Sequence, residues 1–100
     1  MSRRLIVRPE AEADLAEIVR WYEEKHAGLG WQFAEEAGQA LERALGNPRA
    51  YRLMRRQPQV RRILVRRFPY RIFYVLRDDA LVVFAVIHGK RREATWIDRV

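Results

Sequence analysis

The sequence predicts an α+β domain in which an N-terminal strand and an α-helical hairpin precede an antiparallel sheet, in the order β-α-α-β-β-β. Three observations support this fold class. Apolar residues recur at helical spacing in the first half, the spacing becomes that of strands after residue 60, and turn residues separate the apolar runs of the second half. Because 100 residues is about the size of one domain, we expect a single domain over residues 1–100.

The first strand and the first helix are predicted to follow each other directly. Residues 5–7 are apolar between arginines, and Pro9 both ends this strand and suits the first position of a helix. From Pro9 to about His26 the apolar residues fall on one helical face, and acidic residues near the start complement the helix dipole. That face consists of Ala11, Leu15, Ile18, Val19 and Tyr22.

The second helix is predicted to form an antiparallel hairpin with the first. Gly28 and Gly30 interrupt the first helical pattern, and a second amphipathic pattern runs from Phe33 to Leu45. The sequence Gly-Asn-Pro at 46–48 ends it. Residues 49–59 are expected to be an exposed connection.

Three strands of an antiparallel meander are predicted at residues 60–68, 71–77 and 81–88, which are rich in β-branched and aromatic residues. Residues 81–87 are apolar on both faces, as expected for a central strand with helices on one side and further side chains on the other. The N-terminal strand is expected to join this sheet.

The charge is concentrated in the second half. Twenty Lys and Arg residues against 13 Asp and Glu give a net charge of +7, of which residues 1–47 contribute −3 and residues 48–100 contribute +10. Eight arginines and no acidic residue occur between Arg49 and Arg67. Such a run either contacts a phosphate-bearing or acidic partner or forms a solvated face of an arginine-rich protein.

The sequence has few of the residues that several kinds of catalytic and metal-binding site require. The chain has no cysteine, one serine, one threonine and no glycine-rich phosphate loop, so thiolate zinc sites and cysteine or serine nucleophiles are not expected. We expect no metal and no cofactor. The N-terminal apolar run is too short for a signal peptide and no run reaches the length of a membrane span, so a soluble, cytoplasmic protein without membrane contact is expected.

His88 is the clearest candidate for catalysis. It follows the apolar strand and precedes Gly-Lys-Arg-Arg at 89–92. An imidazole there could act as general acid or base in RNA cleavage while Arg71, Arg91 or Arg92 stabilises the pentavalent phosphorane without a metal. The alternative is a structural hydrogen bond. The roles of Tyr70, Tyr74 and the tryptophans remain open between packing and contact with a ligand or partner.

The segments FPYRIFY (68–74) and VFAVIHGKRR (83–92), followed by Trp96, resemble the C-terminal signature of the RelE/ParE toxin superfamily. The opening strand, the two helices and the Trp-Tyr pair at 21–22 are similar to the layout of the same superfamily, so the resemblance covers essentially the whole chain. It implies a toxin of a type II toxin–antitoxin module, of the plasmid-stabilisation type, that arrests growth until an antitoxin neutralises it.

The resemblance leaves two activities open. The ParE branch implies a non-enzymatic inhibitor of DNA gyrase, and the 68–71 and 87–92 segments are more similar to that branch. The RelE branch implies a metal-independent, ribosome-dependent mRNA endonuclease, in which the catalytic residues would be Arg71, His88 and Arg91. A nucleic-acid-binding module without toxicity is a third interpretation, supported by the charge alone.

The resemblance also implies partner surfaces. An acidic antitoxin of the ribbon-helix-helix type is expected to fold over the toxin in a hetero-oligomer, with contacts at Trp21, Tyr22, Leu41, Arg66 and Tyr74. The target, either gyrase or the ribosome and mRNA, is expected to contact Arg61, Arg62, Arg66, Arg67, Lys90, Arg91, Arg92 and Trp96.

Overall fold

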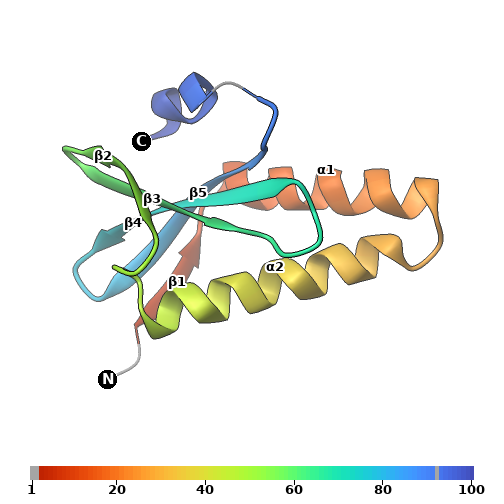
Figure 1. Ribbon diagram of the computed structural model, residues 1–100, viewed down its shortest axis with the longest axis horizontal. Coiled ribbons are helices and arrows are strands. Elements are labelled where there is room, and N and C mark those ends of the chain that lie inside the picture. Colours follow the sequence, from red (N-terminus) through yellow and green to blue (C-terminus); the bar gives the residue numbers. More distant parts are fainter. Residues whose placement is uncertain (1–2, 92) are drawn as a thin grey trace.

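The computed structural model describes residues 3–91 and 93–100, which form five strands, two α-helices and a short 3-10 helix (Figure 1). In chain order these elements are β1 (Arg4–Val7), α1 (Pro9–Lys25), α2 (Leu29–Gly46), β2 (Arg52–Arg56), β3 (Gln59–Leu64), β4 (Tyr70–Arg77), β5 (Ala80–His88) and η1 (Glu93–Arg99).

The five strands form one sheet in the order β1-β5-β4-β3-β2. Strand β1 pairs with β5 in parallel, and all other neighbours are antiparallel. The predicted α+β class and helical hairpin are therefore confirmed, as are the interior position of β5 and the addition of the N-terminal strand to the sheet. The expected exposed connection over residues 49–59 is wrong in part, because β2 forms there and extends the meander from three strands to four.

The helical hairpin covers one face of the sheet (Figure 1). Phe33 of α2 and Tyr74 of β4 are fully buried in the core between the helices and the sheet. The hairpin turn places Gly28 at φ +89°, a conformation that favours glycine. With no side chain to cap α2 at that residue, the carboxylate of Glu23 accepts hydrogen bonds from the backbone N–H groups of Gly28 (2.8 Å) and Gly30 (3.0 Å).

The opposite face of the sheet has its own core, which the C-terminal segment covers. The indole of Trp96 in η1 stacks on the ring of Phe73 at a centroid distance of 5.4 Å and lies 6.3 Å from that of Phe84. Trp96 is therefore part of the core, and its side chain is not on the surface where a target contact was expected.

An irregularity in β5 changes the face of the sheet on which its last side chains lie. Phe73 pairs with Ala85 and Tyr74 with Val83, so Phe84 is an extra residue, a β-bulge. Leu81 and Val83 face the helices before the bulge, whereas Val86 does so after it. His88 follows Val86 by two residues, and its ring contacts that of Tyr70, so it lies on the helix-covered face.

The hydroxyl group of Tyr74 makes a buried hydrogen bond that gives a pH-dependent stability. It donates to the carbonyl oxygen of Pro48 at 2.6 Å, and burial raises the pKa of Tyr74 from 10.0 to about 12. Because the unfolded chain loses this proton at lower pH than the folded protein, the stabilisation is complete below about pH 10 and is lost as the pH rises toward 12.

We expect Tyr74→Phe to be about 1–2 kcal/mol less stable than the wild type at pH 8, because the Pro48 carbonyl loses its donor. This difference should shrink by about 1 kcal/mol for each pH unit above 10, since only the wild type loses the contribution of Tyr74. Urea denaturation of both proteins from pH 8 to 11 measures it. A difference that stays constant with pH would contradict the assignment.

Candidate functional site: a cleft at the open edge of strand β5

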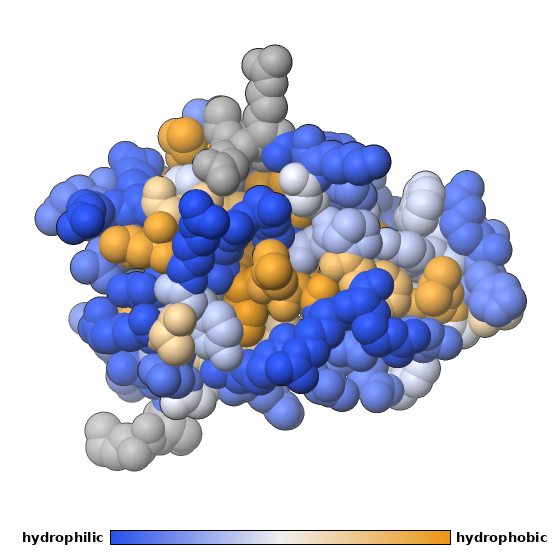
Figure 2. All heavy atoms as spheres, viewed as in Figure 1, coloured by the Kyte–Doolittle hydropathy of each residue, from blue (hydrophilic) through white to orange (hydrophobic). Residues whose placement is uncertain are grey.

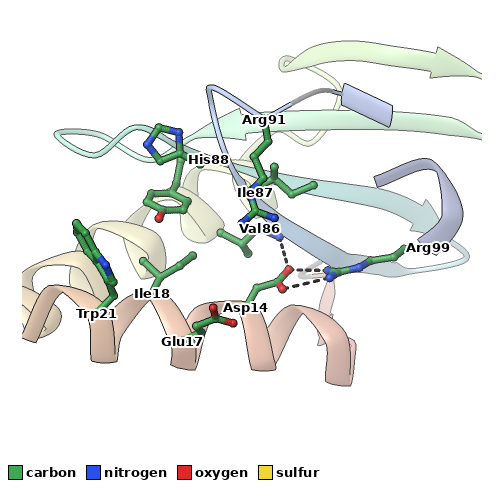
Figure 3. Close-up of a pocket in the computed structure, with 10 residues that line it drawn as sticks. Asp14, Glu17, Ile18, Trp21, Val86, Ile87, His88, Arg91 and Arg99 are labelled. Carbon is green, nitrogen blue, oxygen red and sulfur yellow. Dashed lines mark hydrogen bonds and ion pairs between the residues drawn. The ribbon is translucent and has the colours of Figure 1, made fainter. Parts of the chain in front are cut away.

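A cleft of about 430 Å³ lies between α1 and the C-terminal half of β5 (Figure 3). Strand β1 pairs only with residues 80–83 of β5, so within the described chain no strand borders residues 84–88 on that side. The cleft occupies this open edge. Its lining consists of Asp14, Glu17, Ile18, Trp21, Tyr70, Val86, Ile87, His88, Arg91 and Arg99.

An ion pair forms one end of the cleft. The carboxylate of Asp14 accepts hydrogen bonds from both terminal nitrogens of Arg99, at 2.6 and 3.2 Å. Asp14 also accepts the backbone N–H of Val86 at 2.9 Å (Figure 3). Arg99 donates to the carbonyl of Phe84 at 3.3 Å, so these side chains replace the missing strand. The bond to Asp14 raises the pKa of Arg99, and the pair attaches the C-terminal segment to α1.

The other end of the cleft combines aromatic and charged groups. The rings of His88 and Tyr70 meet edge to face with centroids 5.1 Å apart, and Nδ1 of His88 accepts the backbone N–H of Lys90 at 3.0 Å. Burial raises the pKa of the Tyr70 hydroxyl, Arg91 lowers it and Glu17 raises it further. This end therefore holds a protonated phenol, an imidazole, a guanidinium and a carboxylate, groups that can bind a phosphate or exchange protons.

The structure does not bring the three predicted catalytic residues together. His88 and Arg91 line the cleft, but Arg71 does not. Arg71 precedes Ile72, which faces the helices, so its side chain leaves β4 on the opposite face. The bulge at Phe84 is the physical reason. With strict alternation His88 would share the face of Val82 and Phe84, and the extra residue turns it to the helix-covered face.

The predicted target residues are dispersed as well. Arg61 is held by the carbonyl groups of Arg49 (3.2 Å) and Tyr51 (2.9 Å), whereas Arg62 pairs with Phe73 on the opposite face of the sheet. In the β3–β4 turn, Arg67 donates a hydrogen bond to Gln32 and lies 3.7 Å from Glu36. Three further residues of the predicted target surface are exposed: Arg66, Lys90 and Arg91. Arg92 lies outside the described residues.

The residues predicted to contact the antitoxin differ in how far they are buried. The side chain of Trp21 is 51% exposed, and Arg66 is exposed in the β3–β4 turn. Tyr22 and Leu41 are half-buried and pack against the helix-side core. Tyr74 is completely buried, so in this fold its side chain cannot contact an antitoxin.

Three charged residues of the cleft were not predicted from the sequence: Asp14, Glu17 and Arg99. One signal could have found the first two. Asp14, Glu17 and Trp21 are spaced by three and four residues, which places them on one face of α1 beside the apolar stripe. Arg99 gives no such signal, because only the folding of the C-terminal segment brings it to α1.

Figure 2 shows apolar side chains in the middle of one face, bordered by strongly hydrophilic ones.

In the part of the chain that the structure describes, no group of three or more His, Asp or Glu side chains could hold a metal ion. Within the same residues, neither helix is long and apolar enough to cross a membrane.

Comparison with solved structures shows which fold the chain has. A chain of the chromosomal ParDE toxin–antitoxin system from P. aeruginosa has a TM-score of 0.78 with 13% identity, covering 89% of this chain and 98% of that chain. A mutant of the E. coli toxin RelE in the free state has a TM-score of 0.74 with 23% identity, covering 100% of this chain and 99% of that chain. The fold is that of the RelE/ParE toxin superfamily.

A family model gives the narrower assignment. Residues 5–93 match the model of the ParE toxin of the type II toxin–antitoxin system, parDE. The chain therefore belongs to the ParE toxin family. Among curated proteins no match is found.

Proposed function

We propose that this ParE-family toxin inhibits DNA gyrase by binding it, without a catalytic step of its own. The observation that supports this proposal is that Arg71, whose guanidinium lies beside Gly89, does not line the cleft that contains His88 and Arg91, although an endonuclease of the predicted kind would need all three groups at one phosphate. The exposed residue Arg91, which lines the cleft, and its exposed neighbour Lys90 are the proposed contacts with gyrase.

Membership in a toxin–antitoxin family implies an antitoxin partner. In our proposal this antitoxin is acidic, is of the ribbon-helix-helix type and covers the helical hairpin through Trp21, Tyr22 and Leu41 while its carboxylates meet Arg66. The exposed indole of Trp21 also lines the cleft, so an antitoxin on this surface would cover the gyrase contacts at the same time.

One observation favours the alternative function, ribosome-dependent cleavage of mRNA. The cleft brings His88 and Arg91 together with Glu17, which supplies the carboxylate that the sheet lacks. In that mechanism Glu17 would accept the proton of the attacking 2′-hydroxyl, His88 would protonate the leaving oxygen, and Arg91 would stabilise the phosphorane.

Two assays on the purified toxin separate these functions. If the toxin binds gyrase, supercoiling by gyrase is inhibited, and Arg91→Gln weakens the inhibition by about tenfold or more, because a charge-assisted hydrogen bond is lost. Arg20→Gln removes an equal charge from an exposed position on α1 and should leave the inhibition unchanged.

Primer extension on mRNA in a translation extract provides the second readout. We expect the wild-type toxin to produce no new cleavage sites. Cleavage that His88→Ala and Glu17→Gln abolish, together with unaffected supercoiling, would replace the gyrase proposal with the endonuclease.

A further inference from the structure

A second cavity, of about 700 Å³, lies at the far end of the sheet from His88. Strand β4 begins at Tyr70, opposite His88, and ends at Arg77, opposite Ala80, and this cavity is at the Arg77 end. Arg61 is the one residue of its lining that was expected to contact the target, and the cavity shares no residue with the cleft proposed to bind gyrase. Its lining consists of Arg49, Pro58, Gln59, Arg61, Tyr74, Val75, Leu76, Arg77 and Asp78.

One guanidinium in this cavity is held rigidly by the protein. Arg61 donates through Nη1 to the carbonyl oxygens of Arg49 and Tyr51, and through Nη2 to Oε1 of Gln59 at 3.4 Å. These bonds use three of the five N–H donors of a guanidinium and leave two for a ligand. The side chain is thus ordered before any ligand arrives, which lowers the entropic cost of binding.

The charges of the cavity are not balanced by the protein. Arg49 and Arg77 are exposed, and in the part of the chain that the structure describes no carboxylate lies within 4.0 Å of the three guanidinium groups. Asp78 is the single acidic residue of the lining, so the cavity has a formal charge of +2. Three cations around one cavity repel one another, and an anion between them relieves this repulsion.

We propose that the cavity formed by Arg49, Arg61 and Arg77 binds a phosphate group of a nucleic-acid backbone. Guanidinium groups match the oxygens of a phosphate in paired hydrogen bonds, and a phosphodiester presents such oxygens at regular intervals to an open cavity. An acidic peptide is less suited, because the exposed large hydrophobic residues are Leu5, Ile6, Trp21, Trp31, Leu64 and Ile97, and none of them lines this cavity to anchor a peptide.

The test measures the affinity of the full-length toxin for short fluorescein-labelled oligonucleotides by fluorescence anisotropy, from about 50 to 200 mM salt. Single-stranded DNA, RNA of the same sequence and duplex DNA are compared to identify the source of the phosphate. Arg77→Gln and Arg49→Gln should each reduce the slope of log K against log salt by about 0.7–0.9 and the affinity by about five- to eightfold at 0.1 M salt.

Two further variants make the result specific to the cavity. Arg20→Gln removes the same charge from α1 and should leave both quantities unchanged, whereas Asp78→Asn removes the single carboxylate and should raise the affinity. Asn tolerates the left-handed backbone of Asp78, at φ 54°, so the fold is retained. Equal losses in the Arg77 and Arg20 variants, or displacement of the oligonucleotide by an equimolar poly-glutamate peptide, would overturn the proposal. Neither result depends on whether gyrase is the target.

Discussion

Replacing Trp96 with alanine is expected to lower the free energy of unfolding by about 3–5 kcal/mol. The indole is only 3% exposed and covers Phe73 and Phe84 on the face of the sheet that the helices do not reach. Its removal leaves a cavity in the second core and releases η1 from the sheet. Since small domains unfold with about 5–15 kcal/mol, urea denaturation should show a much lower midpoint.

Two other substitutions test this interpretation. Trp31→Ala removes an equally large side chain that is 69% exposed, so it should change the stability by no more than about 0.5 kcal/mol. Trp96→Phe should cost less than about 2 kcal/mol, because within the described residues the buried indole nitrogen has no hydrogen-bond partner to lose. A Trp96→Ala protein as stable as the Trp31→Ala protein would show that η1 does not pack on the sheet in solution.

Replacing Gly30 with alanine is expected to destabilise the protein by about 1–3 kcal/mol. A Cβ atom at this residue would lie 2.5 Å from the carbonyl oxygen of Val19 and 3.0 Å from Oε1 of Glu23. The first contact is with backbone, so α1 and α2 must move apart, and the second disturbs the carboxylate that caps α2. Thermal and urea unfolding followed by circular dichroism measure the loss.

Gly38 provides the matched control on the same helix. A Cβ atom there meets nothing within 4 Å, so Gly38→Ala should gain the usual advantage of alanine in a helix, about 0.5–1 kcal/mol. The two glycine variants should therefore shift the midpoint in opposite directions. If both stabilise the protein, the close helix contact at Gly30 is absent.

The Asp14–Arg99 ion pair forms one end of the cleft and also holds the C-terminal segment in place. Because β1 ends at Val7, two backbone groups at the open edge of β5 have no strand to bond to, and Asp14 and Arg99 satisfy them. The same pair holds the end of η1 close to α1. The residues that complete the edge of the sheet thus also set the shape of the proposed gyrase-binding cleft.

The residue patterns alone predicted the α+β class, the helical hairpin and the strands that became β1, β3, β4 and β5. In these elements the local signals agree: Pro9 begins a helix, Gly28 ends the hairpin turn, and β5 is apolar on both faces. The Arg-rich strand β2 was missed because its charged side chains resemble a solvated connection, and only pairing with β3 makes it a strand.

The sequence therefore determined which segments form helices and which form the central strands, because burial of apolar residues at a regular spacing is a local property of the chain. Only the tertiary structure decided which side chains meet. The bulge at Phe84 turned His88 away from Arg71, and packing of η1 buried Trp96 and brought Arg99 to Asp14. These outcomes depend on contacts between residues far apart in the chain, which no local spacing encodes.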